Sequence, residues 1–419
     1  MRGICIHGHF YQPPRENAWL EAVETQKSAA PYHDWNERIT EECYAPNAAA
    51  RVLDDEGLIV ALVNNYARMS FDFGPTLLRW LEARRPAVYE AILEADAESA
   101  RRCGGHGGAM AQAFHHTILP LDAERDRRTQ VLWGIEDFRR RFGRDPEGMW
   151  LPETAVDTAS LEELAAAGIR FTVLAPSLAR RWRPLDGDWT EVREGHGIDA
   201  GRPYSVPLPS GRSIAVFFYA GELSRRIAFD GLLRDGAELA RVLAERLGDG
   251  ADARLVSIAT DGETYGHHHR FGDMALGAAL QRLEERDDLR LTNYAEYLAE
   301  HPPRHEVELD EPGSWSCFHG VGRWREDCGC QTGGEPGWSQ AWRAPLRRAL
   351  EWLRGELAEL YEAEAAPLLA DPWAARDDYV RVVLDRGEAS RRAFLDRHSA
   401  AELDARREVR AWKLLEMQR

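Results

Sequence analysis

The sequence predicts an α/β fold, with a parallel sheet or barrel over residues 1–300 and a helical region over residues 301–419. Two observations predict it. Short apolar segments alternate with longer amphipathic ones through the first 300 residues, which is typical of parallel strands joined by helices. After His301-Pro302-Pro303 this alternation stops, and long charged helical patterns follow. At 419 residues the chain is long enough for one large domain and a smaller one.

The predicted elements of the first region follow one another in alternation. The expected strands are Gly3–His7, Ile59–Leu62, Gly148–Trp150, Phe171–Leu174, Ile214–Phe218 and Leu255–Ala259. The expected helices are Asn47–Asp55, Thr76–Arg84, Arg127–Phe142, Ser160–Ala167, Gly236–Leu247 and Asp273–Arg286. Gly168 is a plausible left-handed cap between one helix and the next strand.

The second region opens with a loop rich in Gly, Trp and Cys from Pro312 to Trp338. Helical patterns follow over Pro345–Ala363 and over the stretch from Ser399. The last residues, Glu408–Arg419, keep a helical pattern without a cap or breaker, so we expect the natural chain to continue beyond Arg419.

Composition argues against several function classes. With 53 basic and 70 acidic side chains the net charge is −17, which disfavours nucleic acid and anionic membrane surfaces as partners. We find no apolar run near the roughly 18 residues that a membrane span needs. The first residues predict a strand and not a secretion signal, and six sparse cysteines favour reduced thiols. We therefore expect a cytoplasmic protein, with its oligomeric state left open.

Polar residues that directly follow apolar strands are the first candidates for a site, because in parallel barrels the active site lies at the carboxyl ends of the strands. His7 and His9 are two apart and share a face of the first strand, so they could bind a metal or donate to substrate hydroxyls. Glu153 follows Met149–Trp150 and Pro152, a good place for a nucleophile or base, although Pro-Glu is also a common helix start.

A third strand end is the densest in titratable groups. Strand Val256–Ala259 runs into Asp261, Glu263 and the histidines 267–269, bracketed by glycines that let the backbone approach a ligand. Asp261, at the strand end, is the better candidate for facing the site. His116 alone would be a weak candidate, and we include it only because these other titratable residues accompany it.

A further cluster lies in the loop after residue 312. Cys317, His319, Cys328 and Cys330 offer four soft ligands, enough for tetrahedral zinc. Their spacing differs from the usual Cys-x₂-Cys pairs, so the sequence favours free thiols without a metal, in a loop that covers the site with Trp315 and Trp324. Zinc stays the alternative, and we otherwise expect no cofactor.

Taken together, these segments resemble glycoside hydrolase family 57, the retaining enzymes that act on α-glucans. The motifs that carry the resemblance are His7–Pro13, Ser70–Leu78, His116–Leu121, Trp150–Glu153 and Asp261–His267. The stretch from His106 to Phe114 departs from the family pattern because it lacks an expected glutamate. Together with the Asp-Cys-Gly-Cys loop and the triple histidine, this indicates a less characterised branch.

The resemblance implies an incomplete parallel (β/α)7 barrel and a double-displacement mechanism on α-1,4-linked glucose. Glu153 would be the nucleophile and Asp261 the acid/base, with the pKa of Asp261 raised by burial and by the charge of Glu153. An oligo- or polysaccharide would be the substrate, and amylase, 4-α-glucanotransferase and branching activity stay open. The residues implied in substrate binding are His7, His9, Gln12, His116, Trp150, Glu263, His267 and Trp315.

Two other functions compete with this one. A metal-dependent polysaccharide deacetylase on a related barrel would need an early Asp and a His-x₃-His pair, whereas the first strand supplies His-x-His. A carbohydrate-binding protein without activity would not need two carboxylates placed as Glu153 and Asp261 are.

Overall fold

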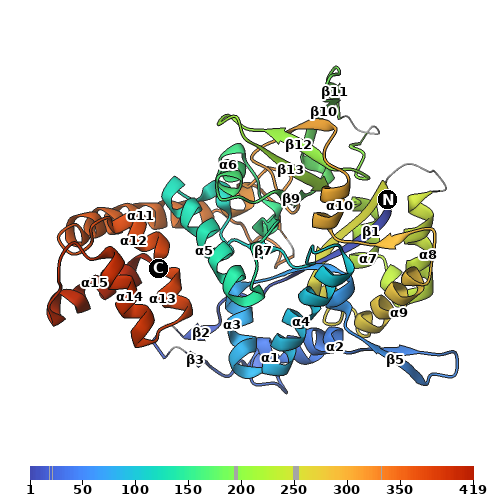
Figure 1. Ribbon diagram of the computed structural model, residues 1–419, viewed down its shortest axis with the longest axis horizontal. Helices are drawn as coiled ribbons and strands as arrows, with labels where there is room; N and C mark the ends of the chain where they lie inside the picture. Colours follow the sequence, from blue (N-terminus) through green and yellow to red (C-terminus); the bar gives the residue numbers. More distant parts are fainter. Residues whose placement is uncertain (18, 21, 193–196, 249–253, 332) are drawn as a thin grey trace.

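The computed structural model describes residues 1–17, 19–20, 22–192, 197–248, 254–331 and 333–419 (Figure 1). Its strands are β1 Arg2–Phe10, β2 Glu16–Asn17, β3 Ala22–Val23, β4 Ala50–Leu53, β5 Ile59–Val63, β6 Ser70–Phe73, β7 Ala111–Gln112, β8 Met149–Trp150, β9 Phe171–Leu174, β10 Ala179–Pro184, β11 Thr190–Glu191, β12 Tyr204–Pro207, β13 Ser213–Phe218, β14 Arg254–Asp261, β15 Arg290–Leu291 and β16 His305–Leu309. Its α-helices are α1 Trp35–Ile39, α2 Ala45–Ala48, α3 Pro75–Arg84, α4 Pro86–Arg102, α5 Glu124–Phe142, α6 Thr158–Ala166, α7 Gly221–Phe229, α8 Gly236–Leu247, α9 Gly272–Glu284, α10 Tyr294–Glu300, α11 Arg343–Ala365, α12 Pro372–Asp378, α13 Val380–Leu384, α14 Glu388–His398 and α15 Ala405–Gln418.

Strand β1 is the centre of the parallel sheet. It pairs with β14 along one edge, and on the other edge with β15 near its start and β6 near its end. All three pairings are parallel, so the carboxyl ends of β14, β1 and β6 lie at the same edge of the sheet. In this register His9 lies opposite Asp261 on one side and Asp72 on the other.

The parallel arrangement continues beyond β6 through shorter pairings. A single bridge joins Phe71 to Ala109, strands β7 and β8 pair in parallel, and another bridge links Gly148 to Phe171 of β9. Strand β9 then pairs in parallel with β13, and the amide of Ala220 donates to the carbonyl of Ser257 in β14 at 2.7 Å. The strands therefore curve round into a barrel-like α/β fold.

A second sheet grows from the same strands. Its order is β11-β10-β16-β12-β13-β9, so β9 and β13 belong both to it and to the barrel-like wall. Strand β16 carries residues beyond 300 into this sheet, where it pairs with β10 and β12. The barrel region is therefore tied to the chain up to Leu309 before the loop rich in Gly, Trp and Cys begins.

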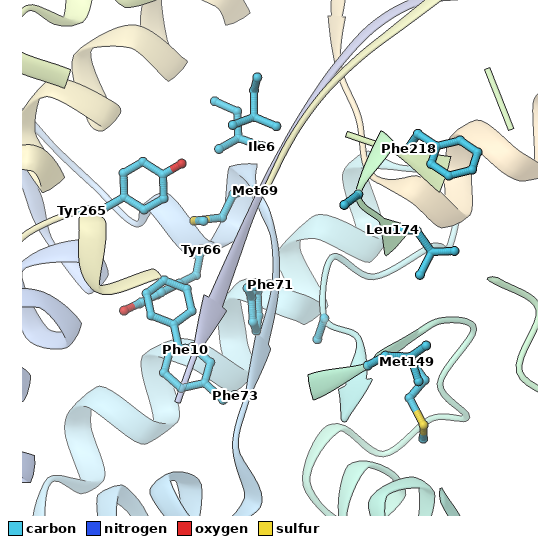
Figure 2. Close-up of a cluster of buried hydrophobic side chains, with 14 of the residues drawn as sticks. Ile6, Phe10, Tyr66, Met69, Phe71, Phe73, Met149, Leu174, Phe218 and Tyr265 are labelled. Carbon is cyan, nitrogen blue, oxygen red and sulfur yellow. The ribbon is translucent and has the colours of Figure 1, made fainter. Parts of the chain in front are cut away.

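The main core lies between the strands and their helices (Figure 2). Phe10 of β1 and Phe73 of β6 stack with ring centroids 4.5 Å apart, and Tyr66 meets both rings edge-on. Strand β1 is buried on both faces from Gly3 to Phe10, so Phe10 lies in this aromatic layer while His7 and His9 lie on the opposite face. The packing fixes the strand ends that carry the candidate site.

The C-terminal helices form a separate core around Tyr361, Phe394 and Trp412. This core packs on α5, where the Trp133 indole donates to the Asp377 carbonyl at 2.9 Å and Arg376 pairs with Asp126 at 2.6 Å. In Figure 1 these helices lie beside the barrel-like part, on the side of α5. The predicted helical region is thus confirmed, although the helix expected from Ser399 begins at Ala405, after the side chain of Asp404 caps it.

Most of the other predicted elements are observed, with one local exception. The predicted helix Asn47–Asp55 is wrong beyond Ala48, because Ala50–Leu53 forms strand β4, with alternating burial, and pairs with β5 in an antiparallel hairpin. The predicted strand Ile59–Leu62 exists as β5 but belongs to this hairpin. Gly168 has the expected left-handed φ of 87°. Among the described helices we find none long and apolar enough to cross a bilayer.

Candidate active site

His9 is held between carboxylates of the two neighbouring strands. Its Nδ1 donates to Asp72 at 2.8 Å, and its Nε2 lies 3.0 Å from Nε2 of His116. Burial alone would lower the pKa of His9, but Asp72, with help from Asp261 and Glu263, outweighs it and raises the pKa to about 9. His9 is therefore a buried imidazolium at neutral pH, in contact with the ring of Trp150.

His7 and His116 flank this cation as neutral imidazoles. Burial lowers the pKa of His7 despite its 3.0 Å hydrogen bond to Asp72, and burial together with the His9 charge lowers the pKa of His116 to about 3. Neutral His116 can accept a hydrogen bond from His9. The side chain of His116 is half-buried and stacks on Tyr11, with ring centroids 3.7 Å apart.

Two of the predicted substrate-binding residues need correction. His7 is fully buried, and its ring nitrogens face Ser70 and Asp72 at 3.0 Å each, so neither is free for a sugar hydroxyl. Trp150 is also fully buried, because it stacks against His7 at 4.7 Å and His9 at 5.2 Å. His7 shares the Asp72 carboxylate with His9, and Trp150 stacks on the His9 ring, so both residues support His9 and expose no surface to a ligand. Sequence spacing does not determine whether an aromatic residue at the end of a strand faces the core or the site, because this depends on the curvature of the sheet.

Glu153 stands in a short 3-10 turn, Pro152–Thr154, directly after β8. Its φ of 59° and the 48° of Thr154 lie in the left-handed region, where non-glycine residues pay of order 1–3 kcal/mol each. Of the carboxylate oxygens, Oε2 accepts from the Trp315 indole at 3.0 Å and from the Ser316 hydroxyl at 2.5 Å. Among the described residues no donor is found for Oε1.

Asp261 ends β14 with its side chain accessible to solvent. The surrounding protein partly removes the carboxyl from water, and this desolvation raises its pKa. The charges of Glu153 and Asp72 also raise the pKa, the His9 cation lowers it, and the net shift is upward. The site thus contains one carboxylate, Glu153, with an oxygen held by two donors, and one carboxyl, Asp261, with a raised pKa. Tyr219, which contacts Trp315 edge-on, adds an aromatic wall near Asp261.

Glu263, two residues after Asp261, supports neighbouring segments of the chain through hydrogen bonds. It accepts from the Tyr44 hydroxyl at 2.5 Å and from the Tyr11 amide at 3.3 Å, and it is buried. Burial raises the pKa of Glu263 to about 7. Gln12, also buried, accepts from Arg15 at 2.6 Å. The contacts found for these two residues place them in support of the segment after β1, and their contact with substrate stays a prediction.

The remaining predicted residues are His267, after β14, and residues of the loop after β16. His267 is half-buried and pairs with Glu42 at 2.5 Å, on the side where Trp35 meets its ring edge-on. Trp315 is half-buried, and its ring contacts Trp150 edge-on at 5.3 Å. Trp315 is therefore the better placed of the two predicted tryptophans to meet a ligand. Cys317, His319, Cys328 and Cys330 gather in the same loop.

The sequence prediction gives no role to several residues of the site, among them Asp72 and Ser316. Asp72, which organises His7 and His9, lies in the segment Ser70–Leu78, within β6 and between two phenylalanines. The rule that selects polar residues after an apolar strand therefore does not select it. Ser316 could not be found in this way, because it reaches Glu153 across 163 residues of sequence.

The Asp72–His9 pair predicts a specific dependence of stability on pH. The folded-state pKa of His9 is about 9 against 6.5 for the free side chain, so the pair stabilises the fold below pH 6.5 and loses this contribution as pH rises through 9. The loss amounts to about 3 kcal/mol at most. We expect the melting temperature of the wild type to fall over this interval and that of Asp72→Asn, already lower, to change little.

Asp96→Asn is the matched control for this measurement. Asp96 is also buried but pairs with Arg144, and arginine keeps its charge over the same interval. The control should lower the melting temperature and leave its slope with pH like that of the wild type. A wild type whose stability is level from pH 6.5 to 9 would contradict the cationic state of His9.

Comparisons with known proteins follow the same division of the chain. The model of Glycosyl hydrolase family 57 matches residues 100–310, and that of Domain of unknown function (DUF3536) matches residues 338–419. The chain is 31% identical over 102 residues to Alpha-amylase 1 of Dictyoglomus thermophilum, which covers 24% of this chain and 14% of that protein. It is 23% identical over 150 residues to a 4-alpha-glucanotransferase of Thermococcus litoralis, covering 34% and 22%.

The solved structures show a similar fold. An exo-type maltose-forming amylase from Pyrococcus sp. ST04 superposes with a TM-score of 0.67 at 15% identity, covering all of this chain and 73% of that one. The matches to the two curated relatives span less than a quarter of the length of either. The family model, by contrast, matches half of the chain, including Glu153 and Asp261. The chain belongs to glycosyl hydrolase family 57.

Proposed function

We propose that this protein is a retaining enzyme that cleaves or transfers α-1,4-linked glucose chains, with Glu153 as nucleophile and Asp261 as acid/base. The observation that carries the proposal is the contrast between the two carboxyl groups at the strand ends. Trp315 and Ser316 hold one oxygen of Glu153, while the surroundings of Asp261 raise its pKa. One group suited to attack and one suited to donate a proton are what double displacement requires.

In the first step Oε1 of Glu153 attacks the anomeric carbon from the face opposite the leaving sugar. The bond to the glycosidic oxygen breaks, and that oxygen takes the proton of Asp261, which leaves a β-linked glycosyl ester on Glu153. The hydrogen bonds from Trp315 and Ser316 to Oε2 fix the carboxylate plane for this attack. The Asp261 carboxylate is then next to the cation of His9, which offsets its new charge.

In the second step the Asp261 carboxylate takes a proton from an incoming hydroxyl. The oxygen of that hydroxyl attacks the anomeric carbon, the ester bond to Glu153 breaks, and the α-configuration is restored. Water as the acceptor gives hydrolysis, and a sugar hydroxyl gives transfer. Retention requires carboxyl groups about 5–5.5 Å apart, which we propose for Glu153 and Asp261 across an incomplete (β/α)7 barrel.

The substrate class is inferred from the family and from its named relatives. Proteins similar to this chain are called an alpha-amylase and a 4-alpha-glucanotransferase, and both names denote action on α-linked glucose polymers. The half-buried Trp315 and Tyr219 near the two carboxyl groups suit the apolar faces of sugar rings. We therefore propose an α-glucan oligosaccharide or polysaccharide as the substrate.

Product size separates the activities that this mechanism allows. We expect wild-type protein, incubated with maltoheptaose or amylose, to change the distribution of chain lengths, as measured by anion-exchange chromatography. Shorter chains with new reducing ends indicate hydrolysis, and longer chains without them indicate transfer. An unchanged distribution with both substrates would overturn the proposed substrate class.

The deacetylase alternative receives less support from the same residues. The histidines of β1 are engaged by Asp72, Ser70 and His116. A protein that only binds carbohydrate would not need the strained backbone that presents Glu153. Acetate release from an acetylated polysaccharide, abolished by a chelator, would favour the deacetylase.

A further inference from the structure

Four potential metal ligands meet in the loop that follows β16. The ligand atoms of Cys317, His319, Cys328 and Cys330 all lie within 4.8 Å of one another. Cys317 Sγ is 3.9 Å from Sγ of both Cys328 and Cys330, and Cys330 Sγ is 3.4 Å from Nδ1 of His319. None of these cysteines forms a disulfide. Two short segments, 317–319 and 328–330, therefore converge on one point.

The distances match those of a tetrahedral zinc site. Zinc binds thiolate sulfur at about 2.3 Å and imidazole nitrogen at about 2.0–2.1 Å, so neighbouring ligands of a tetrahedron stand about 3.8 Å apart for two sulfurs and about 3.5 Å for sulfur and nitrogen. A disulfide would require about 2.05 Å. Three sulfurs and one imidazole in a closed tetrahedral set favour zinc over harder cations.

The backbone of the loop is shaped around the sulfurs. The amide of Arg323 donates to Cys317 Sγ at 3.4 Å, the kind of support that a charged ligand needs. Gly329, between the two later cysteines, has a φ of 81°, so the chain turns there in a conformation that favours glycine. Regular structure in this loop is scarce, since η9 Gly322–Trp324 is the helical turn found among the described residues from 310 to 342. Such a loop has few backbone contacts to define it without a crosslink.

We propose that Cys317, His319, Cys328 and Cys330 bind one structural zinc ion that fixes this loop over the active site. Cys317 directly follows the two residues that hold Glu153, since Trp315 and Ser316 donate to Oε2. The ion crosslinks this segment to residues 328–330. Its binding stands independently, whereas its effect on catalysis rests on the proposed role of Glu153.

Metal content is the direct test. Protein purified under reducing conditions without a metal-affinity step should contain about one zinc per chain by mass spectrometry. After zinc is removed by a chelator under reducing conditions, titration with Co²⁺ should give the strong visible bands of tetrahedral cobalt and a thiolate-to-cobalt charge-transfer band. Metal-free protein that gives only the weak spectrum of hydrated cobalt would overturn the proposal, as would iron in place of zinc.

Variants locate the site without reference to activity. Cys328→Ser combined with Cys330→Ser should lower zinc affinity at least about 100-fold, while Cys103→Ser, the same change at a cysteine in another part of the chain, should retain zinc as the wild type does. Zinc bound equally by all three proteins would overturn the assignment. If the double variant fails to fold, cobalt titration of the chelated wild type decides by its thiolate band. An inactive wild type with full zinc would refute the proposed function and leave the zinc site standing.

Discussion

We expect Glu153→Gln to lower turnover of maltooligosaccharides by on the order of 10⁵-fold, because the variant would lack the proposed oxygen nucleophile that forms the glycosyl ester. Glutamine keeps the size of the side chain and can still accept from Trp315 and Ser316 through its carbonyl oxygen. We therefore expect a folded protein with unchanged circular dichroism and a melting temperature close to that of the wild type. The measurement is release of reducing sugar, or of longer chains, under single-turnover and steady-state conditions.

The matched control is Glu90→Gln, the same substitution on the exposed surface of α4. It should have the activity of the wild type. Turnover by Glu153→Gln within tenfold of the control would remove Glu153 from the reaction. Binding of maltooligosaccharide by Glu153→Gln, measured by calorimetry, shows that the site still accepts substrate when the chemistry is lost.

A small anion distinguishes the nucleophile from a residue that only positions substrate. In Glu153→Ala, azide can occupy the space of the missing carboxylate and attack an activated α-maltosyl fluoride from that face. The product should be the β-maltosyl azide, in which the configuration is inverted, and its anomeric proton coupling identifies it. Rescue that yields the α-azide would assign the attacking face to another residue and contradict the role of Glu153.

The sequence predicted the strand ends better than the neighbours of each side chain. Asp261 and Glu153 lie at or after the ends of apolar strands, where the sequence predicts them, because parallel strands place such ends on one side of the sheet; their part in a reaction stays a proposal. Trp150 is predicted to contact the substrate and is instead fully buried, since the sequence cannot show that His7 and His9 cover its ring. The roles of Asp72 and Ser316 depend on contacts between distant segments, which no local pattern contains.

The helices and strands show the same limit. The amphipathic pattern of Gly236–Leu247 predicted α8 with its bounds, because one apolar face and the cap at Asp235 define it locally. The segment Asn47–Leu53 was ambiguous, since Ala50–Leu53 buries alternate residues only when β5 folds back on it. The local sequence pattern predicts elements that pack on a general apolar surface. It does not predict an element whose secondary structure depends on pairing with one specific segment.

The proposed role of Asp261 as acid/base leads to the second large effect. In Asp261→Asn the leaving sugar departs without a proton, so turnover of maltooligosaccharides should fall roughly 10²- to 10⁴-fold. A substrate with an acidic leaving group, such as 4-nitrophenyl α-maltoside, needs little protonation, and its first step should be much less affected. A burst of 4-nitrophenol followed by a slow steady state is expected, because the variant forms the ester and lacks the base that activates water. Asp287→Asn, on the exposed surface after α9, is the matched control.

The pH profile then separates Asp261 from its buried neighbour Glu263. The acid must carry its proton in the first step, so the wild-type rate should fall as pH rises through the raised pKa of Asp261. Glu263, with its pKa raised to about 7, is the other carboxyl near this strand end that could cause such a fall. The decline should disappear in Asp261→Asn and persist, at a lower absolute rate, in Glu263→Gln. Loss of the decline in Glu263→Gln alone would identify Glu263 as the proton donor. Azide rescue of Asp261→Ala that yields the α-maltosyl azide would identify Asp261 as the acid/base instead.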